Sequence, residues 1–251
     1  MTIQELISKL AEMSGALAVA MLLGLSPRIQ AVPPVGFKYP QRETKFALSL
    51  SAVLLVLTVI FYYFPSQWIS AEKLGLSNDI NNLFSLAIIT LIAVVAVLAL
   101  IRVRRQPLRS IGWHTALLRP AIQFSLALMI LTLFLQGEFM ALFTGLPKNA
   151  IWALGLCLWI CLGEETVFRG FIQQRLNYRF GTYPGLFLTS LIYSLWRLPF
   201  LAVFGWGSQT FWLAAGILIL QSLLLGWIKH KSRHVLVPAL YHAISMWIVF
   251  M

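Results

Sequence analysis

Long apolar stretches separated by short polar segments dominate the hydropathy pattern of the chain. A helix that spans a bilayer needs about 20 predominantly apolar residues. Stretches of this length, or close to it, occur at 46–64, 82–101, 120–136, 150–168, 184–203, 210–228 and 235–251. Proline, glycine, asparagine or clustered charge fill the segments between them, as is typical of loops. The pattern predicts an all-α fold, a polytopic membrane helical bundle with about seven transmembrane helices.

A further apolar run, GALAVAMLLGL at 15–25, lies near the N-terminus. A cleavable signal peptide would start with basic residues and end in a cleavage site of small residues, whereas SPRIQ follows this run. We therefore expect a retained helix that is amphipathic or partly inserted, and an eighth span if it inserts. The proline and glycine residues of 31–40 predict a linker. The expected organisation is an N-terminal helix with a basic linker over 1–45 and a transmembrane bundle over 46–251.

The basic residues lie in alternate loops. Most of the 19 Lys and Arg residues fall in four of them: 26–45, 102–119, 169–182 and 229–234. The loops between these, at 65–81, 137–149 and 204–209, contain two basic residues, Lys73 and Lys148. Short basic loops stay on the cytoplasmic side of a membrane. The alternation predicts an integral membrane protein with cytoplasmic basic loops and with its C-terminus on the opposite side.

Composition supports a bilayer protein. The chain is 59% hydrophobic and 11% charged, whereas soluble domains carry about 25% charged residues. A net charge of +11 could indicate nucleic acid as a partner, but the charges sit in short loops between apolar runs. No basic block is interleaved with aromatic residues on a polar face. We therefore expect the lipid bilayer, and not nucleic acid, as the surroundings of this chain.

Charged residues interrupt one predicted span at EETVFR, residues 164–169. A charge at the bilayer centre costs at least ~2.5 kcal/mol, so these groups should face the protein interior or a wet cavity. Glu165 and Arg169 are four residues apart and can form an ion pair along the helix. Glu164 is turned by about 100° from Glu165 and should be free to point at neighbouring helices.

Two later spans also contain polar groups. In YSLWRLP, Tyr193 and Arg197 share a helix face, and Arg197 needs an acidic partner. Glu164, Glu165 or an acid of another protein could supply it. In HAISM, His242 and Met246 share a face. His242 is either a hydrogen-bonded core residue or a functional group, and the sequence leaves both readings open.

No metal or other cofactor is expected. Cys157 and Cys161 are four residues apart in an apolar run, where free cysteine usually serves as a small buried hydrophobe. A disulfide along one straight helix has poor geometry, and a metal site would need more ligands nearby. The chain has no HExxH zinc motif.

The order of these polar groups resembles the motifs of the CPBP family of intramembrane proteases. This family includes type II CAAX prenyl endopeptidases and bacteriocin-processing or immunity proteins, and its motifs are EExxxR, FxxxH and HxxxN. EETVFR matches the first motif, and Gly170 matches a glycine that often follows it. YSLWR is similar to the second, with Tyr193 for Phe and Arg197 for His; HAISM is similar to the third, with Met246 for Asn. The resemblance covers residues 118–251.

The resemblance implies an endopeptidase in which glutamate activates water without a metal. Glu164 would be the general base and His242 an oxyanion donor, while Glu165 and Arg169 would form a structural ion pair. A membrane protein or a lipid-modified peptide would be the substrate. Arg197, however, cannot accept a proton as the family's histidine does. With Met246 in place of Asn, the oxyanion site lacks one hydrogen-bond donor. Loss of such a donor lowers kcat by about 10²- to 10³-fold in other hydrolases.

Three functions remain open from the sequence. The first is an active endopeptidase in which Glu164 works with His242, or with Arg197 as an electrophile. The second is a proteolytically inactive member that serves as a scaffold, an immunity factor or an accessory subunit of a membrane complex. Two glutamates and two arginines sum to zero charge, which favours this reading. The third is a small transporter or channel, although the chain shows no inverted repeat.

Overall fold

The computed structural model describes residues 3–33, 35–63 and 78–251, and every regular element within these ranges is helical. The longer helices are α1 (Ile3–Leu23), α3 (Pro40–Tyr63), α4 (Asn78–Val103), α5 (Leu118–Leu135), α7 (Lys148–Glu164), α9 (Thr182–Arg197), α10 (Gln209–Ser232) and α11 (Leu236–Trp247). The shorter ones are α2 (Pro27–Gln30), η2 (Leu108–Ile111), η3 (Thr115–Leu117), α6 (Ala141–Thr144), η4 (Glu165–Ile172), α8 (Gln173–Phe180), η5 (Leu198–Phe204) and η6 (Ile248–Phe250). The predicted all-α bundle is confirmed.

Six helices of the described residues are long and apolar enough to cross a membrane, by length and composition. They are Gln4–Leu23, Pro40–Ile60, Leu83–Val103, Thr115–Leu135, Lys148–Phe180 and Gln209–Ser232. A shorter apolar helix covers Leu236–Phe250. The chain is therefore an integral membrane protein, and its N-terminal helix has the length and composition of a span. Helix α3 begins at Pro40, within the predicted linker.

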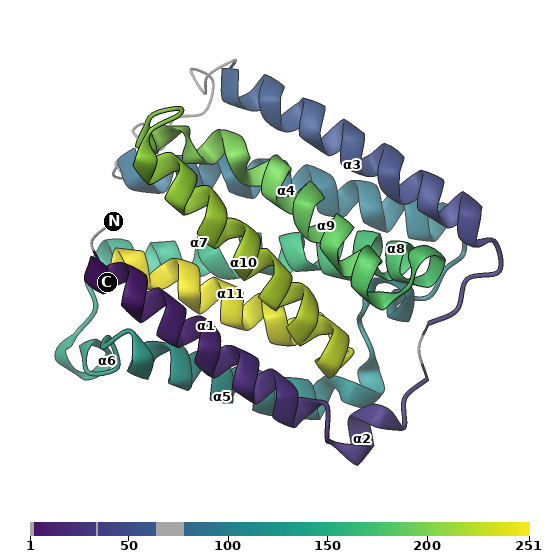
Figure 1. The fold of residues 1–251 in the computed structure, drawn as a ribbon, viewed down its shortest axis with the longest axis horizontal. Coiled ribbons are helices and arrows are strands. Elements are labelled where there is room, and N and C mark those ends of the chain that lie inside the picture. Colours follow the sequence, from purple (N-terminus) through teal and green to yellow (C-terminus); the bar gives the residue numbers. More distant parts are fainter. Residues whose placement is uncertain (1–2, 34, 64–77) are drawn as a thin grey trace.

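Helix α11 lies among the other helices of the bundle (Figure 1) and packs against α5, α7 and α10. On one side of it, an apolar core joins α4, α7 and α9 through residues such as Ile160, Phe168 and Trp196. On the other side, a second core joins α1, α5 and α10 through residues such as Leu23, Leu128 and Ile228. Side chains of α11 belong to both cores, so its residues are held from several directions.

Two charged residues of α1, Lys9 and Glu12, face into the bundle. Lys9 Nζ lies 3.0 Å from Glu12 Oε2 and donates to Ser245 Oγ on α11 at 2.5 Å. Gln136 Nε2 donates to the same Glu12 oxygen at 2.6 Å. These contacts pair the polar groups of α1 within the protein, as a segment in lipid requires. The helix docks by its polar side, while residues such as Leu22 are exposed.

The four basic segments gather at one end of the bundle (Figure 1). Helix α2, the linker before α3, α8 and the α10–α11 connection lie at this end, and both termini and α6 lie at the other. Most of the predicted loop 65–81 falls outside the described residues. Which end faces the cytoplasm stays a prediction.

A buried cluster of charges, the basic-end cluster, ties this end together. Glu43 Oε2 accepts from Arg104 Nη1 and Arg175 Nε at 3.0 Å each, and Glu43 Oε1 accepts from Gln106 Nε2 at 2.8 Å. Arg175 is fully buried, and its Nη1 also donates to the Ser110 carbonyl at 3.2 Å. The cluster joins α3, the segment that follows α4, and α8, which are far apart in the sequence.

Candidate active site

The EETVFR motif lies at a change of helix type. Helix α7 ends at Glu164 and continues as η4, a π-helix over Glu165–Ile172. The sequence predicted only an ordinary α-helical span here, because a π-helix has no hydropathy signature of its own. Such π segments are rare and often occur at functional sites. Gly170 permits close packing at this point, since a Cβ there would overlap the carbonyl oxygen of Ile111 in η2.

Glu164 is held by two residues of the second motif. Its Oε2 accepts a hydrogen bond from the Tyr193 hydroxyl at 2.8 Å, and its Oε1 lies 3.3 Å from Arg197 Nη2. Arg197 Nε in turn donates to the Tyr193 oxygen at 3.2 Å. The side chain of Glu164 is fully buried and that of Arg197 is 13% exposed. Glu164 is thus the acidic partner that Arg197 requires.

Glu165 is bound by a separate set of groups. Arg169 Nε lies 3.5 Å from Glu165 Oε2, and His242 Nδ1 lies 3.2 Å from Glu165 Oε1. Arg169 Nη2 donates to the carbonyl and hydroxyl oxygens of Ser222 on α10, at 3.1 and 2.9 Å. From the sequence we expected His242 to work with Glu164 in catalysis. In the structure its hydrogen-bond partner is Glu165.

Met246 completes the group, because Arg197 Nη2 lies 3.5 Å from its sulfur atom. The structure therefore brings the residues of all three motifs together. We call the charged and titratable members of this group the site cluster: Glu164, Glu165, Arg169, Arg197 and His242. Ser222 was missed by the sequence analysis. The polar pair Gln221 and Ser222 inside an apolar run was the signal that could have found it.

The site cluster has balanced charges but unfilled hydrogen bonds. Its two glutamates and two arginines cancel when all are ionised. Four of its buried atoms nevertheless have no hydrogen-bond partner among the described residues: Glu164 Oε1, Glu165 Oε2, Arg169 Nε and Arg169 Nη1. Most buried polar atoms in proteins are hydrogen-bonded, so this share is unusual.

The geometry limits what each group can do chemically. Arg197 stays protonated in a protein and cannot take a proton from water. The carboxylate of Glu165 can only accept, so His242 Nδ1 must carry the proton of their hydrogen bond. The Nε2 atom of a neutral His242 is then an acceptor. Acting as an oxyanion donor would require the imidazolium form.

Neither a metal nor a disulfide is indicated by the residues that the structure describes. Within 3–33, 35–63 and 78–251, no group of three or more His, Cys, Asp or Glu side chains could hold a metal ion. Cys157 and Cys161 are buried and free. The expectation that the protein needs no cofactor stays a prediction.

Comparison with known proteins matches part of the chain to a family model. The family model Rce1-like, described as type II CAAX prenyl endopeptidase Rce1-like, matches residues 146–248. A search of curated proteins and a search of solved structures found no match. The matched region runs from before α7 to the end of α11 and contains EETVFR, YSLWR and HAISM. The resemblance expected from these motifs is confirmed.

Proposed function

Because residues 146–248 match the Rce1-like family model, we propose that this integral membrane protein is a proteolytically inactive member that serves as a scaffold or accessory subunit of a membrane complex. One observation carries the proposal. Arg197, which stands where the family motif has histidine, lies 3.3 Å from the Glu164 carboxylate.

The ion pair opposes water activation in two ways. The glutamate and histidine of the family motif share the work of taking a proton from water, and Arg197 has no basic nitrogen to offer. Arg197 and the Tyr193 hydroxyl also lie against the Glu164 carboxylate, in the positions that a water activated by Glu164 would need. Glu164 is then a partner in a structural contact and not a general base.

The third motif supports the same proposal. Met246 offers a thioether, a weak acceptor with no proton to donate, and its sulfur faces Arg197. His242 is engaged with Glu165 through Nδ1. The two positions that would stabilise an oxyanion therefore supply no neutral donor between them.

A glutamate-activated endopeptidase is the second candidate, favoured by one specific observation. Glu164 Oε1 is buried and accepts no hydrogen bond from the residues that the structure describes. A water bound to this oxygen could attack a peptide carbonyl that Arg197 polarises. Hydrolysis would then depend on Glu164 alone for proton transfer, and a membrane protein or a lipid-modified peptide would be the substrate.

Partner capture from native membranes separates the two candidates. Wild type, Glu164→Gln and the control Glu138→Gln are purified under the same conditions, and co-purifying proteins are quantified by mass spectrometry. Glu138 is a partly exposed acid near the end of α5. An inactive scaffold retains the same partners in all forms. Accumulation of a protein on Glu164→Gln alone would identify a trapped substrate and contradict the proposal.

We further propose that the basic end of the bundle faces the cytoplasm. The grouping of the basic segments at one end supports this orientation, because short basic loops stay on the cytoplasmic side. A C-terminal reporter that is active only outside the cytoplasm should be active. Activity of a C-terminal reporter that works only in the cytoplasm would contradict the orientation.

A further inference from the structure

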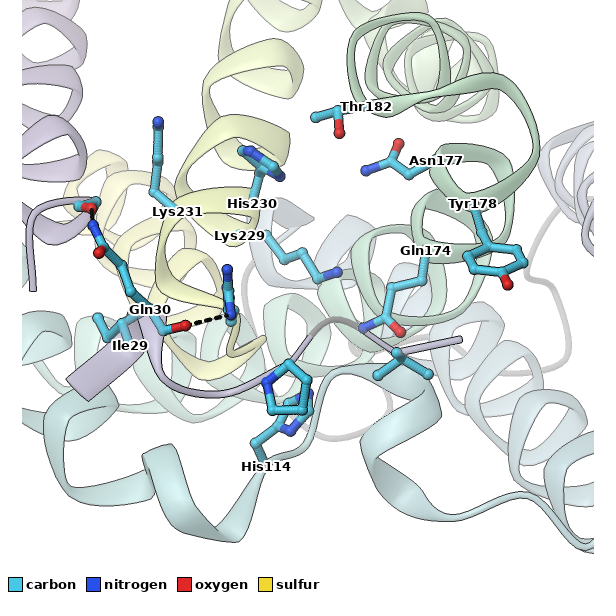
Figure 2. Close-up of a pocket in the computed structure, with 14 residues that line it drawn as sticks. Ile29, Gln30, His114, Gln174, Asn177, Tyr178, Thr182, Lys229, His230 and Lys231 are labelled. Carbon is cyan, nitrogen blue, oxygen red and sulfur yellow. Dashed lines mark hydrogen bonds between the residues drawn. The ribbon is translucent and has the colours of Figure 1, made fainter. Parts of the chain in front are cut away.

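A cavity of about 670 Å³ opens at the basic end of the bundle. The end of α10, α8, α2 and the linker that follows α2 form its walls (Figure 2). Its titratable lining residues are three basic groups, two imidazoles and one phenol: Lys229, Lys231, Arg233, His114, His230 and Tyr178. None of the lining residues that the structure describes is a carboxylate. A cavity of this volume is within the range of small-ligand sites.

Lys229 is the central group of the cavity. Figure 2 shows its side chain extended toward Gln174. With the amide of Gln174 turned so that its oxygen faces Lys229, Nζ donates to this oxygen at 3.0 Å. Lys229 is only 7% exposed, yet it forms no ion pair with any carboxylate of the described residues. Lysine is almost never this buried without a charged partner. The helix dipole attracts cations to the end of α10, but this attraction does not explain burial.

Arg233 provides a second, independent observation. It adopts the left-handed conformation with φ 55° at the C-terminal cap of α10, a position usually taken by glycine. Its Nη1 donates to the Gln30 carbonyl of α2 at 3.3 Å, which leaves other guanidinium N–H groups available. Arginine is unfavourable in this backbone conformation, so its presence here indicates a role for the guanidinium group.

His114, on the opposite wall, reports the electrostatic character of the cavity. Burial lowers its pKa, and the positive charges of Lys229, Arg109 and Arg233 lower it further. His114 is therefore neutral near pH 7 and can donate or accept a hydrogen bond without adding to the positive charge. Asn177 and Thr182 contribute further polar groups on the side of α8.

We propose that this cavity binds the phosphate group of an anionic phospholipid. Lys229 and Arg233 would supply charge-assisted hydrogen bonds to the phosphate oxygens. The cavity lies at the end of the bundle, where headgroups meet the protein, and basic pockets between spanning helices suit anionic headgroups. The phosphate would provide the negatively charged partner that Lys229 lacks in the cavity. This proposal is independent of whether the site cluster is catalytic.

Lipid binding to the purified full-length protein tests the proposal. Wild type is compared with Lys229→Gln/Arg233→Gln and with the control Arg28→Gln/Arg179→Gln. The control makes the same change in charge at the same end, on exposed residues that do not line the cavity. Native mass spectrometry of the folded protein counts bound phosphatidylglycerol against phosphatidylcholine. Removing each basic group should weaken binding about fivefold, which gives about 25-fold for the cavity double variant.

The outcomes are distinct. Preferential binding of phosphatidylglycerol by wild type and control, and its loss in the cavity variant, would support the proposal. Equal weakening in the cavity variant and the control would indicate general surface attraction and overturn it. Inorganic phosphate is titrated as a separate arm, and binding as tight as that of the lipid would overturn the lipid assignment. If the double variant does not fold, Arg233→Gln alone should still weaken binding about fivefold.

Discussion

The site cluster and the basic-end cluster both bury carboxylates beside guanidinium groups, but they differ in how fully their hydrogen bonds are filled. In the basic-end cluster each nitrogen of the Arg175 guanidinium has an acceptor: Glu43, Ser110, Phe171 or Gln106. In the site cluster, two nitrogens of Arg169 and one oxygen of each glutamate have no hydrogen-bond partner among the described residues.

The difference separates a structural contact from the site that we propose to be inactive. A buried ionic cluster stabilises a fold only when its desolvation is offset by complete hydrogen bonding. The basic-end cluster meets this condition. In the site cluster Arg197 balances the charge, but the hydrogen bonds are incomplete. This is what we expect of a hydrolytic arrangement in which an arginine replaced a histidine.

Glu43→Gln should have the largest effect on stability. It would leave the fully buried Arg175 without its carboxylate, and breaking a buried pair in this way costs about 3–5 kcal/mol. Thermal unfolding in detergent should show a large fall in Tm, and Glu138→Gln should show almost none. Similar Tm values for the two variants would mean that the basic-end cluster is not the structural contact that the comparison requires.

Glu164→Gln should also destabilise, by about 3 kcal/mol, because it leaves Arg197 mostly buried and unpaired. The double variant Glu164→Gln/Arg197→Met should recover most of this loss, since it removes both charges. Removing a catalytic carboxylate often leaves stability unchanged or increases it. Unchanged or higher Tm for Glu164→Gln would therefore favour the second candidate, the active endopeptidase.

Gly170→Ala tests the packing between the two clusters. The added methyl group would overlap the Ile111 carbonyl next to Ser110, at a cost of about 1–3 kcal/mol for overpacking. Gly155→Ala on α7 is the matched control, because a Cβ there meets nothing within 4 Å. That variant should be neutral or slightly stabilising. A neutral Gly170→Ala would show that η2 and η4 do not pack closely.

The effect of a single histidine at the basic end appears only on acidification, as a pH dependence of stability. Burial lowers the pKa of His234 from 6.5 to about 4, so the unfolded chain binds a proton more readily than the folded one. Stability is complete above pH 6.5 and falls toward pH 4, by at most about 1.4 kcal/mol per pH unit. Tm measured across this range should fall less steeply for His234→Asn. Equal slopes would contradict the assignment.

The sequence predicted most of the fold because hydropathy is a local property. Five of the seven expected spans correspond to long apolar helices, whereas those at 184–203 and 235–251 correspond to the shorter helices α9 and α11. The four-residue spacing of Glu165 and Arg169 predicted their contact. The sequence also limited the acidic partner of Arg197 to a few residues, one of which was Glu164. These inferences needed only helix geometry and the cost of charge in lipid.

Features that depend on packing between distant segments were not predicted. Glu43 and Arg175 are separated by 132 positions, and each looked like a charge of a basic loop or its border. The pairing of His242 with Glu165 instead of Glu164 depends on how α11 is rotated against η4. The π-helix and the close approach of Gly170 to the Ile111 carbonyl were also missed, because neither periodicity nor spacing reveals them.

The most direct test of the central claim is a comparison of newly formed N-termini in the membrane proteome. Cells that contain wild type or Glu164→Gln at equal abundance are compared by mass spectrometry of N-terminal peptides. The account predicts the same cleavage products in both, because Glu164 is held by Arg197 and activates no water. A cleavage product that is present with wild type and absent with Glu164→Gln would contradict it.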